Sequence, residues 1–70
     1  MMRTTYDPEA DAYYARFAPD QIEIAETQEV APGVIIDLDA NGDLVGIEVL
    51  SVRLRATGRY GTAQKAAAAE

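Results

Sequence analysis

The chain has 70 residues, with 12 acidic against 6 basic side chains, no cysteine and no histidine. A domain of this size buries only about 60% of its unfolded surface, so it usually needs disulfides, a metal or a partner subunit. The missing residue types exclude disulfides and remove the commonest metal ligand and general base. We therefore expect a single homodimeric domain over residues 1–57, followed by a flexible Ala-rich tail over 58–70.

Charge is divided unevenly along the chain. Residues 1–52 hold eleven acids against Arg3 and Arg16, a net charge of −9, whereas residues 53–70 hold four basic residues against Glu70, a net charge of +3. An acidic body repels nucleic acid phosphates, so a basic protein is the better electrostatic partner. No stretch approaches the roughly 20 apolar residues of a membrane span, and the N-terminus lacks the regions of a signal peptide. We expect a cytoplasmic protein that contacts neither membrane nor nucleic acid directly.

The first third of the chain predicts short elements separated by turns. Met2 to Tyr6 reads as a strand, and Asp7-Pro8-Glu9 is typical of a helix start, with the aspartate at the N-cap. Residues 12–17, AYYARF, fit either an aromatic-rich strand or a helical face, and their pattern alone leaves the choice open. Residues 22–29 alternate as a second strand would.

Residues 37–48, DLDANGDLVGIE, match the calcium-loop pattern D-x-[DN]-x-[DN]-G-x5-E. That motif requires a helix on each side, but a β-branched run enters this loop and Gly46 interrupts the segment that leaves it. A tight hairpin with Asn41-Gly42 at the two central turn positions fits better. It places six apolar side chains on one face, in these pairs: Leu38 with Val45, Ile36 with Ile47, and Val34 with Val49.

The second face of this hairpin carries the only candidate metal ligands, Asp37, Asp39 and Glu48, with Gly46 leaving open space opposite Asp37. Solvated acids on the outside of a sheet are the commoner explanation, because Ca²⁺ takes six or more oxygens and two strands supply few. We expect no cofactor. Small-ligand or cation binding by the acidic face of the 34–50 hairpin is the alternative function.

Two turns and one helix complete the predicted fold. Pro32-Gly33 matches the central pair of a type II turn. Ser51 is placed to cap a short helix over residues 52–56, which Thr57-Gly58 would end. The chain is therefore expected to be mainly β, or α+β at most: a small antiparallel meander with a tight Asn-Gly hairpin and a short C-terminal helix.

Two blocks of the sequence carry a resemblance to a known family: YDPEADAYY at 6–14, and NGDLVGIEVL at 41–50 preceded by PGVIID at 32–37. Together they resemble a small bacterial family called domain of unknown function 2283, over roughly residues 3 to 52. The resemblance implies a compact antiparallel sheet and favours a strand at 12–17. It implies no activity, cofactor or catalytic residue. Genes of similar proteins often neighbour those of another small protein, which suggests a paired, antitoxin-like module.

Catalysis is not expected. Ser51 is the only serine and has no histidine to activate it, and Lys65, the only lysine, lies in the tail. Tyr13 and Tyr14 point to opposite faces if they lie on a strand. We expect one to pack in the core and the other to reach a dimer or partner surface, which makes Tyr13, Tyr14 and Phe17 the interface candidates. The predicted function is a homodimeric protein-interaction module.

Overall fold

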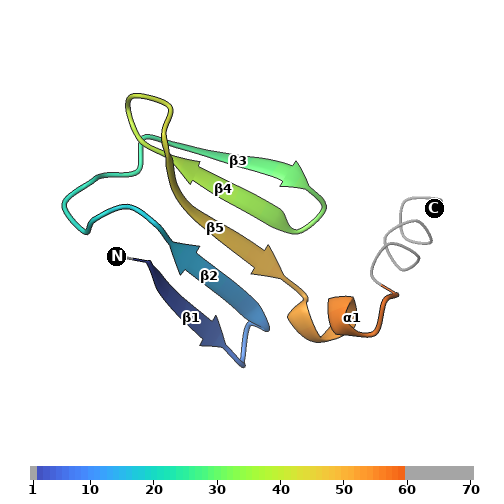
Figure 1. Cartoon of the computed structure of the whole chain (residues 1–70). Helices are drawn as coiled ribbons and strands as arrows, with labels where there is room; N and C mark the ends of the chain where they lie inside the picture. Colours follow the sequence, from blue (N-terminus) through green and yellow to red (C-terminus); the bar gives the residue numbers. More distant parts are fainter. Residues whose placement is uncertain (1, 60–70) are drawn as a thin grey trace.

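The structure is a computed structural model and describes residues 2–59. Five strands form one antiparallel sheet in the order β1-β2-β5-β4-β3, and one helix follows the last strand (Figure 1). The elements are β1 Arg3–Asp7, β2 Ala12–Arg16, β3 Glu26–Ala31, β4 Val34–Leu38, β5 Leu44–Leu50 and α1 Val52–Ala56. The mainly β antiparallel fold with a short C-terminal helix is confirmed.

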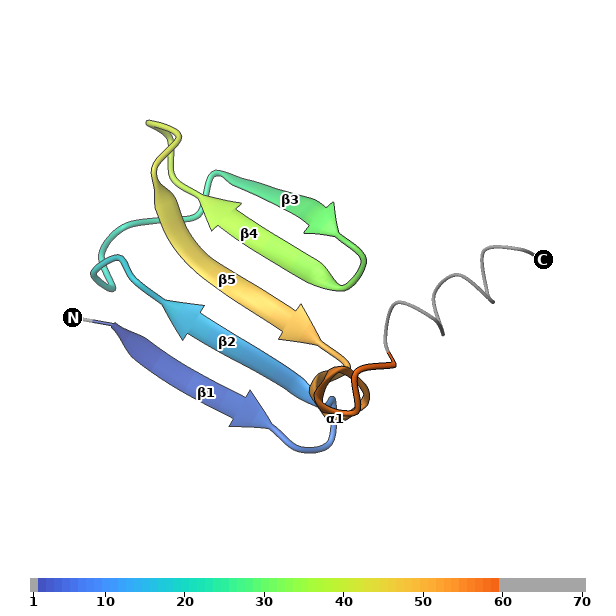
Figure 2. The same ribbon diagram turned by 45° about the vertical axis from the view of Figure 1, so that its right-hand side comes forward.

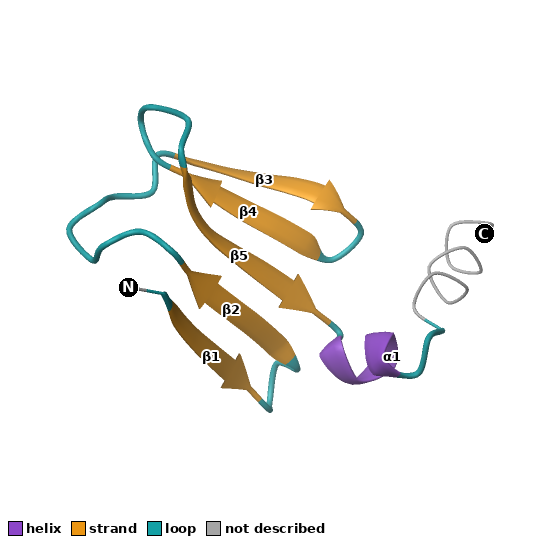
Figure 3. Cartoon of the chain, in the orientation of Figure 1, coloured by secondary structure: helices purple, strands orange, loops and turns teal. Residues whose placement is uncertain are grey.

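The sheet is built from two consecutive units. Strands β1 and β2 form a hairpin, β3, β4 and β5 form a meander, and the units join where β2 pairs with β5. The β2–β3 connection carries the chain to the far edge, so β1 and β3 are the outer strands (Figure 2). Helix α1 lies beyond the end of β5 and packs across neither face (Figure 3). Within residues 2–59, no helix is long and apolar enough to cross a membrane.

Residues 12–17, for which the sequence pattern allowed either a helix or a strand, form the strand β2 and the residue that follows it. Tyr13 stands between Tyr6 of β1 and Val49 of β5, and Ala15 faces Ile47. Directly paired residues share a face. This defines the apolar face, which carries these side chains from four strands: Thr4, Tyr6, Tyr13, Ala15, Val34, Ile36, Ile47 and Val49. Phe17 continues β2 by one residue, its N–H donating to the Val45 carbonyl at 2.8 Å, and the alternation of side chains assigns it to the same face. The opposite side, which carries Arg3, Tyr14, Arg16, Asp37 and Glu48, is the polar face.

The predicted register of the β4–β5 hairpin holds up to Asp37 and then changes. Val34 faces Val49 and Ile36 faces Ile47 as expected, but Leu38 faces Leu44 instead of Val45 because a bulge shifts the register. The turn also differs, since Gly42 has a positive φ of 84° and Asn41 does not. The Asp39 carboxylate is the physical reason. It accepts hydrogen bonds from the backbone N–H groups of Asn41 and Asp43, each at 2.9 Å, and so holds a three-residue loop in place of a two-residue one.

Other boundaries move by a few residues. The strand expected at 22–29 begins only at Glu26, because the segment before it belongs to the β2–β3 connection. Asp7 ends β1 instead of starting a helix, and its Oδ1 accepts from the N–H groups of Glu9 (3.0 Å) and Ala10 (3.3 Å) within a turn. Gly33 has a φ of 71°, as a type II turn requires. The tail predicted for 58–70 falls, beyond Arg59, outside the described residues.

The sheet has very little core of its own. Among the described residues, Val45 is fully buried and Ala12 nearly so, and no other apolar side chain reaches that degree of burial. A sheet contributes to a stable domain when a second layer covers its apolar face. The described chain supplies no such layer, so the apolar face is the candidate functional surface.

Candidate functional site

The apolar face exposes three aromatic rings. Tyr6 is 42% exposed, Tyr13 37% and Phe17 41%, while Ile47 and Val49 between them and β4 are half-buried. All side chains of this face on β1, β2, β4 and β5 are uncharged. Exposed aromatic groups on an uncharged surface are typical of protein interfaces. Two of the three predicted interface residues, Tyr13 and Phe17, therefore lie on one surface.

The third candidate, Tyr14, lies on the polar face and is half-buried. Its hydroxyl donates to Asp37 Oδ2 at 3.0 Å, and Thr27 Oγ1 donates to Oδ1 of the same carboxylate at 2.9 Å. This network links β2, β4 and β3 across the top of β5. Burial, followed by the hydrogen bond to Asp37, raises the pKa of the Tyr14 hydroxyl. Tyr14 has a structural partner, which leaves it less suited to an interface than Tyr13.

The predicted cation ligands do not converge. Both oxygens of Asp37 accept hydrogen bonds, and Asp39 Oδ1 is held by the turn. The space expected beside Gly46 is filled by the Tyr14 hydroxyl, because a Cβ at position 46 would stand 2.2 Å from it. In residues 2–59 no group of three or more acidic side chains is arranged to hold a metal ion.

Asp11 has a structural role that the sequence did not reveal. Its backbone has a φ of 54°, and its carboxylate accepts from Tyr6 Oη at 2.6 Å and from the Arg53 backbone N–H at 3.1 Å. The hydrogen bond from Tyr6 is the main cause that lowers the pKa of Asp11, and the same bond raises the pKa of Tyr6. Asp11 therefore fastens the β1–β2 turn to the start of α1.

Asp11 caps helix α1 in place of Ser51, so the predicted cap is wrong. Ser51 has a φ of 57° and makes no side-chain capping hydrogen bond. The carbonyl of Asp11 accepts from the Val52 N–H at 3.2 Å, and its carboxylate takes the next N–H. A cap from 42 residues away leaves no local signal in the sequence. The helix itself, and its end at Gly58 with a φ of 77°, agree with the prediction.

Arg16 holds the β2–β3 connection to the sheet. Its Nε donates to the Ala18 carbonyl at 3.2 Å, and its Nη2 donates to the carbonyls of Pro19 at 3.0 Å and Ile22 at 2.7 Å. The side chain is only 15% exposed. The only hint of this role in the sequence is that Arg16 and Arg3 are the only basic residues before position 53.

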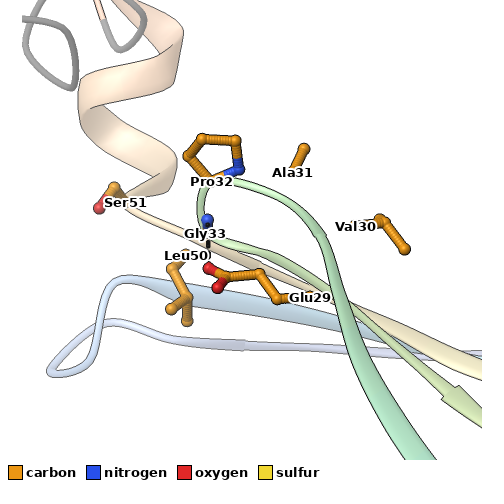
Figure 4. A pocket seen from close by; sticks show the side chains of 7 residues that line it. All are labelled: Glu29, Val30, Ala31, Pro32, Gly33, Leu50 and Ser51. Atoms are coloured by element: carbon orange, nitrogen blue, oxygen red, sulfur yellow. Dashed lines mark hydrogen bonds between the residues drawn. The ribbon is translucent and has the colours of Figure 1, made fainter. Parts of the chain in front are cut away.

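An open pocket lies where the β3–β4 turn meets the end of β5 (Figure 4). Seven residues line it: Glu29, Val30, Ala31, Pro32, Gly33, Leu50 and Ser51. The Glu29 carboxylate accepts from the Gly33 N–H at 3.1 Å and so braces its own turn. The pocket offers one carboxylate and one hydroxyl but no histidine, which the chain lacks altogether. That donor set gives no activated nucleophile, and the expectation that the protein is not an enzyme stays a prediction.

These features define a small single-sheet β domain with one apolar face uncovered by the described chain. The model of the family described as a protein of unknown function, DUF2283, matches residues 3–53, and the chain belongs to this family. The resemblance carried by the two sequence blocks is thereby confirmed. No curated protein and no solved structure matches the chain.

Proposed function

We propose that this protein is an interaction module that self-associates by stacking its apolar face on that of a second copy. The observation that carries the proposal is the exposure of Tyr6, Tyr13 and Phe17 on a sheet that has no second layer in the described chain. Aromatic side chains supply most of the binding energy in many interfaces. A homodimer also meets the need of a 70-residue chain without cysteine for additional buried surface.

The distribution of charge supports a second copy as the occupant. The body of the chain is strongly acidic, so two copies repel wherever their charged surfaces meet. The side chains of the apolar face on four of the five strands are uncharged, and Glu26 and Gln28 of the edge strand β3 bond to each other at its margin. Two identical sheets share the same twist and can pack face to face about 10 Å apart.

The experiment is sedimentation velocity on the full chain across a range of concentrations. Tyr13→Ser and Phe17→Ser together should reduce the size of the assembly and abolish any rise of melting temperature with protein concentration. Leu54→Ser is the matched control, because Leu54 is as exposed as Tyr13 (37%) but lies on α1. Equal effects of the control and the double variant, or none from either, would rule out the apolar face as the contact.

The charged surfaces support a further element of this function, a basic protein partner. Asp37, Glu48 and Glu29 lie on the polar face, away from the stacking surface, so both contacts can form at once. Co-expression with the product of a neighbouring gene, followed by purification through one tagged component, tests this directly. A basic partner should dissociate as salt rises, because exposed charges are screened.

A further inference from the structure

The two edges of the sheet differ in their fitness to pair with another strand. An edge strand presents unpaired backbone N–H and C=O groups that can add a further strand. In β3 the register is broken between Glu29 and Ala31, and bulges of this kind discourage such pairing. In β1, which lies at the edge of the sheet beside β2 (Figure 2), all five residues, Arg3 to Asp7, keep a continuous register with β2. The outer side of β1 is therefore the better template.

The charged residues of β1 are placed so that two antiparallel copies of the strand attract each other. Arg3 stands at one end of the strand and Asp7 at the other, and the three residues between them are uncharged. If two copies of β1 run antiparallel with Thr5 opposite Thr5, each Arg3 faces the other copy's Asp7. Sliding the strands by two residues sets Arg3 or Asp7 against Thr5 and loses both ion pairs, and sliding them by four sets Arg3 against Arg3 or Asp7 against Asp7. The charges thus favour the register with Thr5 opposite Thr5 over the others. Strand β3 has acids and no basic residue, so it lacks this property.

We infer that β1 pairs antiparallel with β1 of a second copy about a two-fold axis at Thr5, and that one sheet then runs through both copies. The contact is separate from the stacking of apolar faces proposed above and does not depend on it. A two-fold axis perpendicular to the sheet keeps each face on its own side, so the apolar faces of the two copies join into one continuous surface. Edge pairing and stacking together give an assembly of four copies with two kinds of two-fold contact.

The side chains at both ends of β1 already have partners within the chain but are exposed enough to reach a second copy. Arg3 is 61% exposed in its side chain, and its one ion pair in the described chain is with Asp20 of the β2–β3 connection, which is itself 72% exposed. Asp7 uses Oδ1 to cap its own turn, so Oδ2 remains available to the guanidinium of the other copy. Exposed pairs of this kind add little to affinity, and their contribution here is to the choice of register and partner.

Charge reversal tests the inference best where stacking has been removed. In the Tyr13→Ser, Phe17→Ser background we expect a dimer held by β1 alone. Adding Arg3→Glu or Asp7→Arg should shift the dimer toward monomers, because each replaces two attractive contacts by two like-charged ones. An equimolar mixture of these two variants should dimerise again, because each opposed pair then combines an acid with a base. Glu26→Arg on the other edge is the control and should leave the dimer intact.

A cysteine at the two-fold position gives a second, independent measurement. The chain has no cysteine, so Thr5→Cys can form a disulfide only with its own copy in a second chain, where the two Cα atoms would stand within bonding range. Mild oxidation should cross-link this variant at least tenfold faster than Gln28→Cys on β3. Asp7→Asn, which keeps the acceptor for the turn, should fold normally and weaken the dimer less than Asp7→Arg.

The outcomes separate the two contacts. If the background is monomeric, its mixed variants stay monomeric and Thr5→Cys is not cross-linked, edge pairing is wrong and stacking is unaffected. If Tyr13→Ser and Phe17→Ser leave the assembly of the otherwise wild-type chain unchanged while Arg3→Glu divides it, stacking is wrong and edge pairing stands.

Discussion

The hydroxyl of Tyr14 lies in the space that a side chain at position 46 would need. A Cβ built on Gly46 would stand 2.2 Å from Tyr14 Oη and 2.9 Å from the carbonyl oxygen of Ala15. Position 46 must be glycine for Tyr14 to cross β5 and reach Asp37 on β4. The small residue in the middle of a central strand is thus the condition for the polar network that ties three other strands together.

Gly46→Ala should therefore destabilise the fold. Overpacking of this kind typically lowers the free energy of unfolding by about 1–3 kcal/mol, and urea denaturation measures it. Tyr14→Ala in the same chain removes the nearer obstacle and leaves the Ala15 carbonyl, so the double variant should lose less than the sum of the two single losses. Strictly additive losses would show that Tyr14 is not what the new methyl group meets.

Tyr14→Phe isolates the hydrogen bond to Asp37. The ring is kept and the hydroxyl is lost, so we expect a loss of about 0.5–1.5 kcal/mol in the free energy of unfolding at neutral pH. Because the folded-state pKa of Tyr14 is raised, the folded protein keeps its phenol proton longer than the unfolded chain does. The stabilisation is complete below the ordinary tyrosine pKa and is lost as pH rises from there through the folded value.

Alkaline denaturation checks the sign of this effect. Wild-type stability should fall above about pH 10, the ordinary tyrosine pKa, and the fall should be shallower in Tyr14→Phe. Tyr6→Phe is the companion variant, since the hydrogen bond to Asp11 raises the pKa of Tyr6 in the same direction. A slope unchanged in both variants would mean that neither phenol is linked to folding.

The sequence predicted what repeats along a strand and missed what joins distant segments. Alternation fixed the pairing of Ile36 with Ile47, because a shift of one residue would have exchanged the two faces. The same alternation placed Tyr13 and Tyr14 on opposite faces. It could not show that Tyr14 would fill the space beside Gly46, because that contact depends on the lateral neighbour of β5. Nor could it show that Asp11 would cap a helix 42 residues later.

Asp11→Asn tests that distant cap. Asparagine tolerates the same left-handed backbone, so the change removes charge and leaves the turn conformation intact. Because the pKa of Asp11 is lowered in the folded state, its ionised form supports the fold above the ordinary carboxyl pKa, and this support is lost as pH falls through the folded value. We expect hydrogen exchange at the Arg53 amide to quicken several-fold in the variant. An unchanged rate would show that the charge of Asp11 does not contribute to the cap.

Ser51→Gly distinguishes the observed cap from the one that the sequence predicted. If the serine hydroxyl capped α1, its replacement by alanine would lower stability by about 0.5–2 kcal/mol and its replacement by glycine by a few tenths. In the structure Ser51 makes no such bond and holds a φ of 57°, a conformation that strains non-glycine residues. Glycine relieves that strain, so we expect thermal denaturation to show no loss and a gain of at most about 1 kcal/mol. A clear loss of stability in Ser51→Gly would indicate that the serine hydroxyl does cap the helix.

Arg16→Lys should lower the free energy of unfolding even though the substitution keeps the positive charge. The guanidinium spans three carbonyls of the β2–β3 connection from two nitrogens, a geometry that a single ammonium group cannot reproduce. The hydrogen bonds to Ala18 and Ile22 are only part-buried, so we expect their loss to cost about 0.5–1.5 kcal/mol in the free energy of unfolding. Arg3→Lys is the control, because Arg3 is exposed and its one ion pair in the described residues is with Asp20, and we expect its loss to stay within about 0.5 kcal/mol. Comparable losses in the two variants would show that Arg16 acts through charge alone, and proteolysis within residues 18–24 would then not increase in Arg16→Lys.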